Sequence, residues 1–509
     1  MFEWLLAILA GAVLLSALAR KLGAPYPSFL ALGGAALAFV PGVPEIVLDP
    51  ELALVVMVAP VLLDAAYDAS VRDLRENWVP ILGLALASVL VTAVAVAIVA
   101  RALVPELPWA AAIALGAVVA PPDAAAAEAV LASVRLPKRI ATILEGESLL
   151  NDATALLLYR AAVTAVSVPF LSWSGHIAPL ALSLIGSLIL GPLLALVWLR
   201  LIRNITDPPS SIILQFSGTF AVWILAESLG LSAILTIVSY AVTIARRAPS
   251  IMSASLRINA YAVWDTAVFL LNVLAFVLIG MQLRPIFDRL GDQRLGDSLV
   301  LAAAVVVTVI LARLVWVMGY VGVLRAIGWR QKAPVGERTQ GPTWSGAVVV
   351  SWAGMRGLVT LATALALPVH FPARDALVLS AFAVVLGTLV LQGLTLRWVI
   401  GRFDMSGPDP FEAEVRFARE RCLRAAMQSL DGDQTPEALE IRREYRLRLD
   451  PDTPGAPGFS APHDALRAKA VTAARREVER LRESEEIGDD AYHLIEEDLD
   501  HLEVARGPA

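Results

Sequence analysis

The sequence predicts an all-α protein that spans a membrane many times and ends in a charged cytosolic tail. Apolar residues make up 57 % of the 509 residues and charged residues 17 %, a balance typical of polytopic membrane proteins and not of large soluble enzymes. Apolar runs long enough to cross roughly 30 Å of hydrocarbon recur up to about residue 400. The charges gather beyond them, because residues 403–509 hold 40 of the 88 charged residues, 25 acidic and 15 basic.

Breaking the apolar runs at Pro, Gly and charge clusters predicts thirteen membrane-spanning helices. They lie near 2–19, 26–41, 50–67, 78–100, 108–132, 140–166, 177–199, 210–229, 231–245, 261–281, 298–324, 344–369 and 375–396. Loops after odd-numbered spans hold sixteen Lys and Arg residues, and loops after even-numbered spans hold five. Because basic residues collect in cytoplasmic loops, we expect a multi-pass protein of the cell (inner) membrane with its N-terminus outside and its C-terminus in the cytoplasm.

The chain divides into a transmembrane domain, residues 1–402, and a charged cytosolic tail, residues 403–509. Helical stretches separated by Pro and Gly are expected in the tail, which is either regulatory, dimer-supporting or a solvated charged face. The acidic balance belongs to this tail and carries no indication of nucleic-acid binding. A single cysteine, Cys422, excludes an intramolecular disulfide and a cysteine-based metal site.

Two spans are interrupted at corresponding places. Pro121 and Pro122 break the fifth span beside Asp123, and residues 354–357 (Gly-Met-Arg-Gly) break the twelfth. Spans five and twelve differ by seven, as expected if spans 1–6 and 8–13 form two inverted six-helix repeats joined by span 7. Interrupted helices in matching halves are the best sequence indication of a transporter site at the membrane midplane, where such helices cross.

The sixth span carries an unusual polar cluster. Glu147, Ser148, Asn151 and Asp152 form two adjacent stripes on one helix face, because residues four apart lie above one another. A charge at the bilayer centre costs about 2.5–3.5 kcal/mol on insertion scales, so such residues have a partner or a function. Asp, Asn and Ser oxygens suit a bare monovalent cation, and the carboxylate can accept a proton when the site is empty. Hydrogen bonding between helices is the alternative role for Ser148 and Asn151.

Other polar residues at membrane depth complete the candidate site. Asp123 is expected near the ion, or as the N-cap of the second half-helix, and the two roles are compatible. Arg356 needs an acid, and we expect a structural ion pair with Glu147 between the two repeats. Asp64, near the inner end of span three, is a candidate for the cytoplasmic funnel or a simple interfacial carboxylate. We expect no cofactor and no metal other than a monovalent cation at Asp152, Asp123 and Ser148.

At these residues the chain resembles the cation:proton antiporter family that includes bacterial NhaP-type sodium/proton antiporters and the animal sodium/proton exchangers. The resemblance covers roughly residues 5–400, and five motifs carry it: Ala120–Ala124, Leu144–Ala153, Asn272–Gly280 with Leu283, Ser351–Gly357, and Thr388–Leu389 with Gln392–Leu394. The sequence departs from the pattern of many members of this family in two places. Pro122-Asp123-Ala124 stands where they have Thr-Asp-Pro, and Asp64 stands where they often have Glu.

The resemblance implies a thirteen-span homodimer in which a core domain moves against a dimerisation domain in an alternating-access cycle. It implies Asp152 as the central carboxylate for cation and proton, with Asn151, Ser148, Asp123 and Pro122 around the cation. The activity implied is antiport of H⁺ against Na⁺, with Li⁺ and K⁺ as further candidate cations, in electroneutral one-for-one exchange that serves pH homeostasis. Two alternatives are an intramembrane aspartyl protease that uses Asp123 and Asp152, and a cation channel.

Overall fold

The computed structural model describes residues 2–22, 24–43, 49–123, 126, 137–167, 173–205, 207–252, 254–290, 295–328 and 342–403, and every regular element among them is a helix. The elements are α1 (Phe2–Leu22), α2 (Tyr26–Leu37), α3 (Pro50–Ala53), η1 (Leu54–Val58), α4 (Ala59–Asp68), α5 (Val71–Glu76), α6 (Trp78–Leu82), η2 (Gly83–Ser88), α7 (Val89–Leu103), α8 (Trp109–Val119), α10 (Lys138–Ser167), α11 (Trp173–Ile202), α12 (Pro208–Ser228), α13 (Ala233–Ile251), α14 (Ala254–Met281), α15 (Leu283–Leu290), α16 (Leu295–Ala326), α17 (Trp344–Trp352), α18 (Leu358–Leu365) and α19 (Arg374–Gly401). Contacts divide the chain into Met1–Ser406 and Gly407–Ala509, and the described residues fall in the first unit. The predicted tail helices lie outside them.

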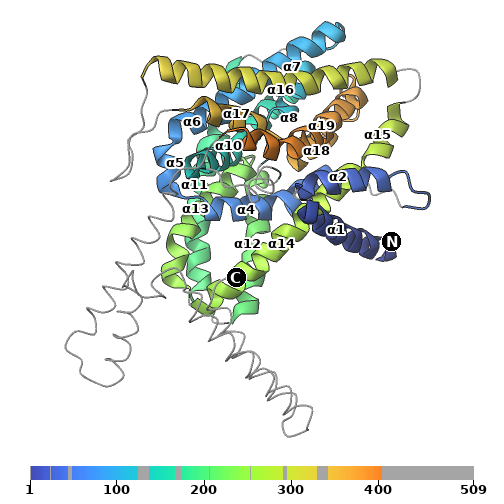
Figure 1. The fold of residues 1–509 in the computed structure, drawn as a ribbon. Coiled ribbons are helices and arrows are strands. Elements are labelled where there is room, and N and C mark those ends of the chain that lie inside the picture. The colour runs from blue at the N-terminus through green and yellow to red at the C-terminus, as the bar shows by residue number, and fades with distance from the viewer. Residues whose placement is uncertain are drawn as a thin grey trace, which may run out of the picture. The chain divides into compact units, whose positions relative to one another are not determined.

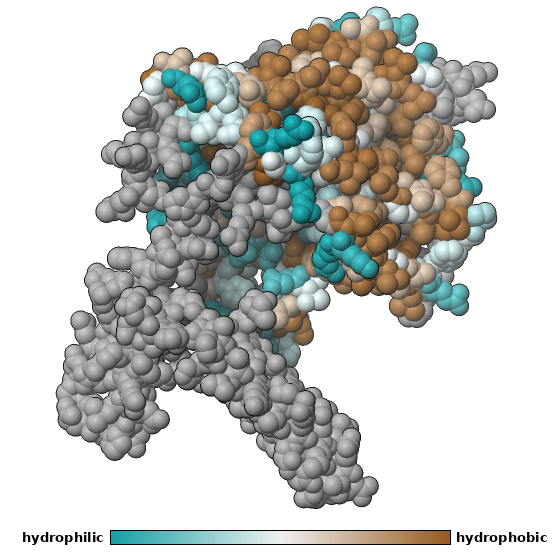
Figure 2. Space-filling view, in the orientation of Figure 1, coloured by the Kyte–Doolittle hydropathy of each residue, from teal (hydrophilic) through white to brown (hydrophobic). Residues whose placement is uncertain are grey.

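Helix is present in each of the thirteen predicted segments. Seven described helices are long and apolar enough to cross a membrane on their own: Trp78–Leu103, Arg139–Val166, Ala181–Ile202, Pro208–Ser228, Asn259–Arg289, Gly296–Ala326 and Arg374–Gly401. Hydrophobic residues cover much of the visible face (Figure 2), as expected where lipid replaces water. The multi-pass, all-helical class is therefore confirmed, whereas thirteen crossings and inverted repeats stay predictions.

The helices form two packed groups (Figure 1). In the group that we name the α14 group, α14 packs along α2, and α13 packs along α11 and α4, with α1 and α12 beside them. In the α16 group, α16 packs on α7, α17 and α19, and α8 lies between α7 and α10. A buried hydrogen bond of 2.5 Å from Ser28 Oγ of α2 to the Leu389 carbonyl of α19 joins the two groups. The cavity described below lies between them.

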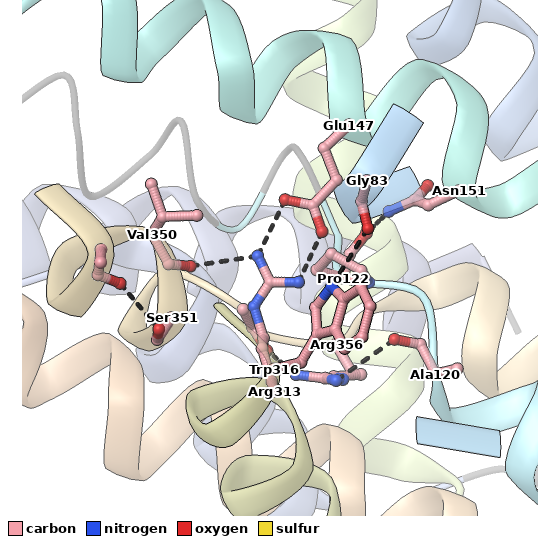
Figure 3. Close-up of polar contacts among 12 residues, drawn as sticks. Gly83, Ala120, Pro122, Glu147, Asn151, Arg313, Trp316, Val350, Ser351 and Arg356 are labelled. Carbon is pink, nitrogen blue, oxygen red and sulfur yellow. Dashed lines mark hydrogen bonds and ion pairs between the residues drawn. The ribbon is translucent and has the colours of Figure 1, made fainter. Parts of the chain in front are cut away.

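Two spans contain a widened, π-helical segment. The segment η1 precedes Pro60 in α4, and a proline cannot donate the backbone hydrogen bond that a regular turn requires. The second, η2, begins at Gly83, whose carbonyl accepts a hydrogen bond of 3.1 Å from the Trp316 indole (Figure 3). One turn away, the Tyr320 hydroxyl donates to the Val79 carbonyl at 2.9 Å. Side chains of α16 thus satisfy carbonyl groups that the irregular helix exposes within the protein.

Small residues let α2 and α14 approach closely. A Cβ on Gly34 would overlap the backbone of Val277, and a Cβ on Gly280 would overlap the backbone of Ala31. Contacts of this kind between small residues are a common way for membrane helices to associate, since van der Waals packing replaces the hydrophobic effect in lipid. The sequence Leu32-Gly33-Gly34 therefore marks a helix contact.

We expect Gly34→Ala to lower thermal stability by the equivalent of about 1–3 kcal/mol, because the new methyl group meets main-chain atoms that cannot rotate away. Gly11→Ala in α1 is the matched control. Nothing lies within 4 Å of its added Cβ, so the better helix propensity of Ala should leave stability equal or slightly higher. Melting curves of both purified variants in the same detergent provide the measurement, and equal melting temperatures would contradict the close α2–α14 contact.

Candidate functional site

Two interrupted helices meet at the centre of the site. The helix α8 ends at Val119 before Pro121 and Pro122, and α17 and α18 are separated by residues 353–357. The Asp123 backbone N–H donates to the Met355 carbonyl at 2.7 Å, so the two breaks are hydrogen-bonded to each other. The predicted interruptions are confirmed, and their contact explains how irregular backbone is tolerated inside a membrane protein.

Arg356 closes the end of α8. Its fully buried guanidinium donates to the carbonyls of Val119 (3.1 Å), Ala120 (3.2 Å) and Gly354. The last carbonyls of a helix have no partner within it and carry the negative end of the helix dipole, which a cation stabilises. Arg356 therefore binds backbone at the break and lies against the negative end of α8 (Figure 3).

Asp123 lies where glycine leaves room for it. A Cβ on Gly357 would overlap the Asp123 carboxyl group, so only glycine permits this approach of the two breaks. The Oδ2 atom of Asp123 also accepts a hydrogen bond of 3.3 Å from the Ala126 N–H. A hydrogen bond over three residues is the spacing of a helix N-cap. An N-cap is one of the two roles that the sequence predicted for Asp123.

The polar stripes of α10 face in different directions. Asn151 is buried, and its Nδ2 donates to the Pro122 carbonyl at 3.0 Å, while its Oδ1 accepts no hydrogen bond from the described residues. Ser148 and Asp152, one turn apart on the neighbouring stripe, instead line a cavity. The pairing of Asn151 with Pro122 fixes α10 to the first break (Figure 3).

Glu147 is paired with Arg313 of α16, and the predicted Glu147–Arg356 ion pair is wrong. The pair is bidentate, with Arg313 Nη1 at 2.5 Å from Oε1 and Nη2 at 2.9 Å from Oε2, and both side chains are 1 % exposed. Nη2 of Arg313 also donates to the Val350 carbonyl at 3.1 Å. Arg356 needs no carboxylate, because backbone carbonyls and the α8 dipole offset its charge.

A cavity with about 700 Å³ of space free of protein atoms lies between the α14 and α16 groups. Asp123, Glu145, Ser148 and Asp152 line it from the α16 side, and η1, α4 and α14 line it from the other side. On that second side, Asn272 of α14 is the polar residue of the lining. None of the described lining residues is basic, so within the described part of the chain the carboxylates and hydroxyl form an acidic, oxygen-rich site. Such a set suits hard monovalent cations and protons.

The structure separates the sequence-predicted residues into two sets. Asp152, Asp123 and Ser148 meet in the cavity, whereas Asn151 and Pro122 bond to each other beside it. Asp64 lies on a different face of α4 and lines a second cavity. Sequence reasoning missed Glu145 in the cavity and Arg313 as the partner of Glu147. The sequence does mark Arg313 as a second candidate partner beside Arg356, because it is the one charged residue between Asp297 and Arg325.

Removing one partner of the buried pair should destabilise the protein strongly. We expect Arg313→Ala to cost about 3–5 kcal/mol, since it leaves the Glu147 carboxylate buried and unpaired. The control is Arg284→Ala, which removes a pair that is half exposed and 3.6 Å apart, and should change stability by less than about 1 kcal/mol. The double variant Glu147→Gln with Arg313→Gln should recover part of the loss. The pairing would be contradicted if the melting temperature of the double variant fell by as much as those of Glu147→Gln and Arg313→Gln added together.

The chain matches a known protein family over nearly all of its first 402 residues. Residues 5–401 match the family described as "Sodium/hydrogen exchanger, transmembrane". A protein of Mycobacterium tuberculosis (strain ATCC 25618 / H37Rv), named an uncharacterized Na⁺/H⁺ exchanger, is 33 % identical over 443 residues, which cover 84 % of this chain and 79 % of that protein. A sodium, potassium, lithium and rubidium/H⁺ antiporter of Bacillus pumilus (strain SAFR-032) is 28 % identical over 497 residues, covering 93 % of this chain and 73 % of that protein.

A solved structure has a similar fold. The sodium proton antiporter MjNhaP1 from Methanocaldococcus jannaschii superposes with a TM-score of 0.61 at 18 % identity, over 79 % of this chain and 97 % of that chain. At this identity the likeness establishes the fold alone. The resemblance predicted from the motifs is thereby confirmed, and the chain belongs to the sodium/hydrogen exchanger family.

Proposed function

We propose that this protein exchanges a monovalent cation for H⁺ across the cell (inner) membrane, with Asp152 as the carboxylate that both ions share. The observation that carries the proposal is the cavity between the two helix groups, where Asp152, Asp123 and Ser148 meet with no basic residue in the lining. Na⁺ is the first candidate, and Li⁺ and K⁺ are further candidates. The name of the Bacillus pumilus relative covers Na⁺, K⁺ and Li⁺.

Transport is favoured over the two alternatives. Relatives from Bacillus pumilus and from Synechocystis sp. (strain ATCC 27184 / PCC 6803 / Kazusa) are named antiporters, which supports transport. An aspartyl protease would need Asp123 and Asp152 to activate a water molecule between them. A protease of this kind does not require the interrupted helix or the hydrogen bond between Asn151 and Pro122. A transporter does, because both hold a cation site at the break.

Coupling follows from competition for one carboxylate. Asp152 holds either a proton or a cation, so each ion must leave before the other binds. The neighbouring Asn151 is neutral, and the charge of Glu147 is offset by Arg313. We take Asp152 as the one group that exchanges its proton in each cycle, which makes the exchange electroneutral with one cation per proton. Asp123 and Ser148 contribute oxygen atoms, and Asn151 holds the Pro122 backbone beside them.

The two helix groups are the natural moving parts. The cavity lies between them, so a displacement of the α16 group against the α14 group would expose it to one side and then the other. We assign the α16 group to the moving core domain and the α14 group to the dimerisation domain of a homodimer in the bilayer. The N-terminus would lie outside and the tail, residues 403–509, in the cytoplasm as a regulatory appendage.

Asp152→Asn should abolish exchange while the protein stays folded, because the amide can no longer bind and release a proton. The measurement is Na⁺-driven proton movement in proteoliposomes, with gel filtration to verify folding and assembly. Asp297→Asn, at an exposed position in the first turn of α16, is the matched control and should transport normally. Normal exchange by Asp152→Asn would exclude Asp152 as the shared carboxylate.

The apparent affinity for Na⁺ should depend on pH. Below the pKa of Asp152, protons occupy the site, and apparent affinity should fall about tenfold for each pH unit, as linkage requires when one proton leaves per cation bound. At high pH too few protons are available for the return step, so the rate should follow a bell-shaped profile. Raising Na⁺ on both sides should move the acid limb to lower pH. An affinity independent of pH, measured in vesicles at symmetrical pH, would rule out competition at one carboxylate.

A further inference from the structure

A second cavity lies within the α14 group. It is partly open to solvent and holds about 690 Å³ of space free of protein atoms, between α4, α11, α12, α13 and α14. Asp68 is the last residue of α4, and Arg257 lies in the first turn of α14, so the cavity is at the ends of these helices that the loop charges predict to be cytoplasmic.

The lining carries an excess of negative charge. Among the described residues, Asp64, Asp68 and Asp265 are its acidic members and Arg257 is its one basic member, which leaves a formal charge of −2 on this part of the lining. The Arg257 guanidinium is engaged at the wall, where Nη1 donates to the Met252 carbonyl at 2.6 Å. A ligand that balances this cavity is therefore a cation.

Aromatic side chains form much of the wall around these carboxylates. They are Tyr67, Trp198, Tyr240, Tyr261 and Trp264. Trp264 is fixed in place, since its indole donates to Gln215 at 2.8 Å and its ring stacks on Phe216 at 4.2 Å. Tyr67 and Tyr261 contact each other edge to face at 6.2 Å. Aromatic faces attract quaternary ammonium groups through cation–π interactions, which add to the attraction of the carboxylates.

The wall also holds an unsatisfied hydrogen-bond donor. Trp198 is 6 % exposed, and its indole N–H has no hydrogen-bond partner among the described residues. A buried donor without a partner is unfavourable, and an acceptor atom on a ligand would supply one. The apolar residues Leu63, Ile244 and Ala248 complete the lining and suit a ligand with a hydrophobic part.

This cavity is distinct from the ion cavity. On α4, Leu63, Asp64 and Tyr67 line the second cavity, whereas Val61 and Ala65 line the first, on another face of the helix. The two sets of lining residues share no member. An occupant of the second cavity would therefore contact α4 and α14 without reaching Asp152.

We propose that this second cavity binds organic ammonium cations that carry an apolar or aromatic group and an acceptor oxygen. The carboxylates of Asp68 and Asp265 attract the ammonium group, the aromatic wall surrounds it, and the apolar residues take the remainder. The proposal does not depend on the transport reaction, because it concerns binding at a separate site.

The test is calorimetric titration of the purified full-length protein, in a non-ionic detergent, with benzoylcholine. Its neutral analogue 3,3-dimethylbutyl benzoate, in which carbon replaces the ammonium nitrogen, is the ligand control. We expect saturable binding of benzoylcholine and at least tenfold weaker binding of the neutral ester. The double variant Asp68→Asn with Asp265→Asn should weaken benzoylcholine binding at least tenfold, with each single variant intermediate, and Asp297→Asn should have no effect.

The variants also separate the two cavities. Melting curves must first show that the Asp68 and Asp265 variants are folded. Both positions are exposed, so the single variants can be measured even if the double variant is unstable. Absence of saturable binding in the millimolar range, or unchanged affinity in folded Asp68→Asn and Asp265→Asn variants, would overturn the proposal. Binding that is lost in Asp152→Asn but kept in those variants would place the ligand in the ion cavity and also overturn it.

The ammonium group could belong to a free solute or to a lipid headgroup. Nanodiscs distinguish these sources, since phosphatidylglycerol lacks an ammonium group and phosphatidylethanolamine has one. Benzoylcholine binding that weakens when phosphatidylethanolamine is added supports a lipid headgroup as the resident ammonium. Binding that is equal in both membranes supports a free cation at the same site.

Discussion

The structure depends on satisfying backbone groups where two helices are interrupted inside the membrane. In hydrocarbon an unpaired carbonyl or amide costs several kcal/mol, and the breaks at residues 120–123 and 353–357 would expose several of them. The protein meets this requirement with three contacts: Asp123 N–H to the Met355 carbonyl, the Arg356 guanidinium to the end of α8, and the Asn151 amide to the Pro122 carbonyl. These contacts bring α8, α10 and α17 together, and the ion cavity forms beside their meeting point.

Charge is used in two ways around this point. Glu147 and Arg313 offset each other, and Arg356 is offset by carbonyl dipoles, so these three charges stabilise the arrangement and stay constant. The acids that line the cavity have no basic residue among their lining neighbours. A carboxylate in that setting is stabilised by whatever cation or proton reaches it. The charges of Glu147, Arg313 and Arg356 thus hold the fold, whereas the carboxylates that line the cavity are placed where a cation or proton can reach them.

Much of this could be predicted from the sequence, and the failures have physical causes. Apolar runs, the Pro121-Pro122 pair and the Gly-Met-Arg-Gly segment determine local structure, so the helices and both breaks were predicted. The polar stripe of α10 follows from helical periodicity. The partner of Glu147 could not be derived, because Arg313 and Arg356 both lie within apolar segments and the choice depends on how distant helices pack. The prediction that Asp64 lies in a cytoplasmic funnel or at the membrane interface stays a prediction, and its position on α4 did not reveal which cavity that face of the helix lines.

Arg356 contacts α8 through main-chain oxygen atoms only, and this affects how the sequence can diverge. A guanidinium that binds carbonyls does not distinguish the side chains of Val119 and Ala120. A substitution of either side chain would keep the two carbonyl acceptors, so its effect would come from the packing around these buried positions. Gly357 has no such freedom, because its missing side chain is the space that Asp123 occupies. At one crossing, Arg356 thus depends on the main chain of α8, whereas Gly357 depends on having no side chain of its own.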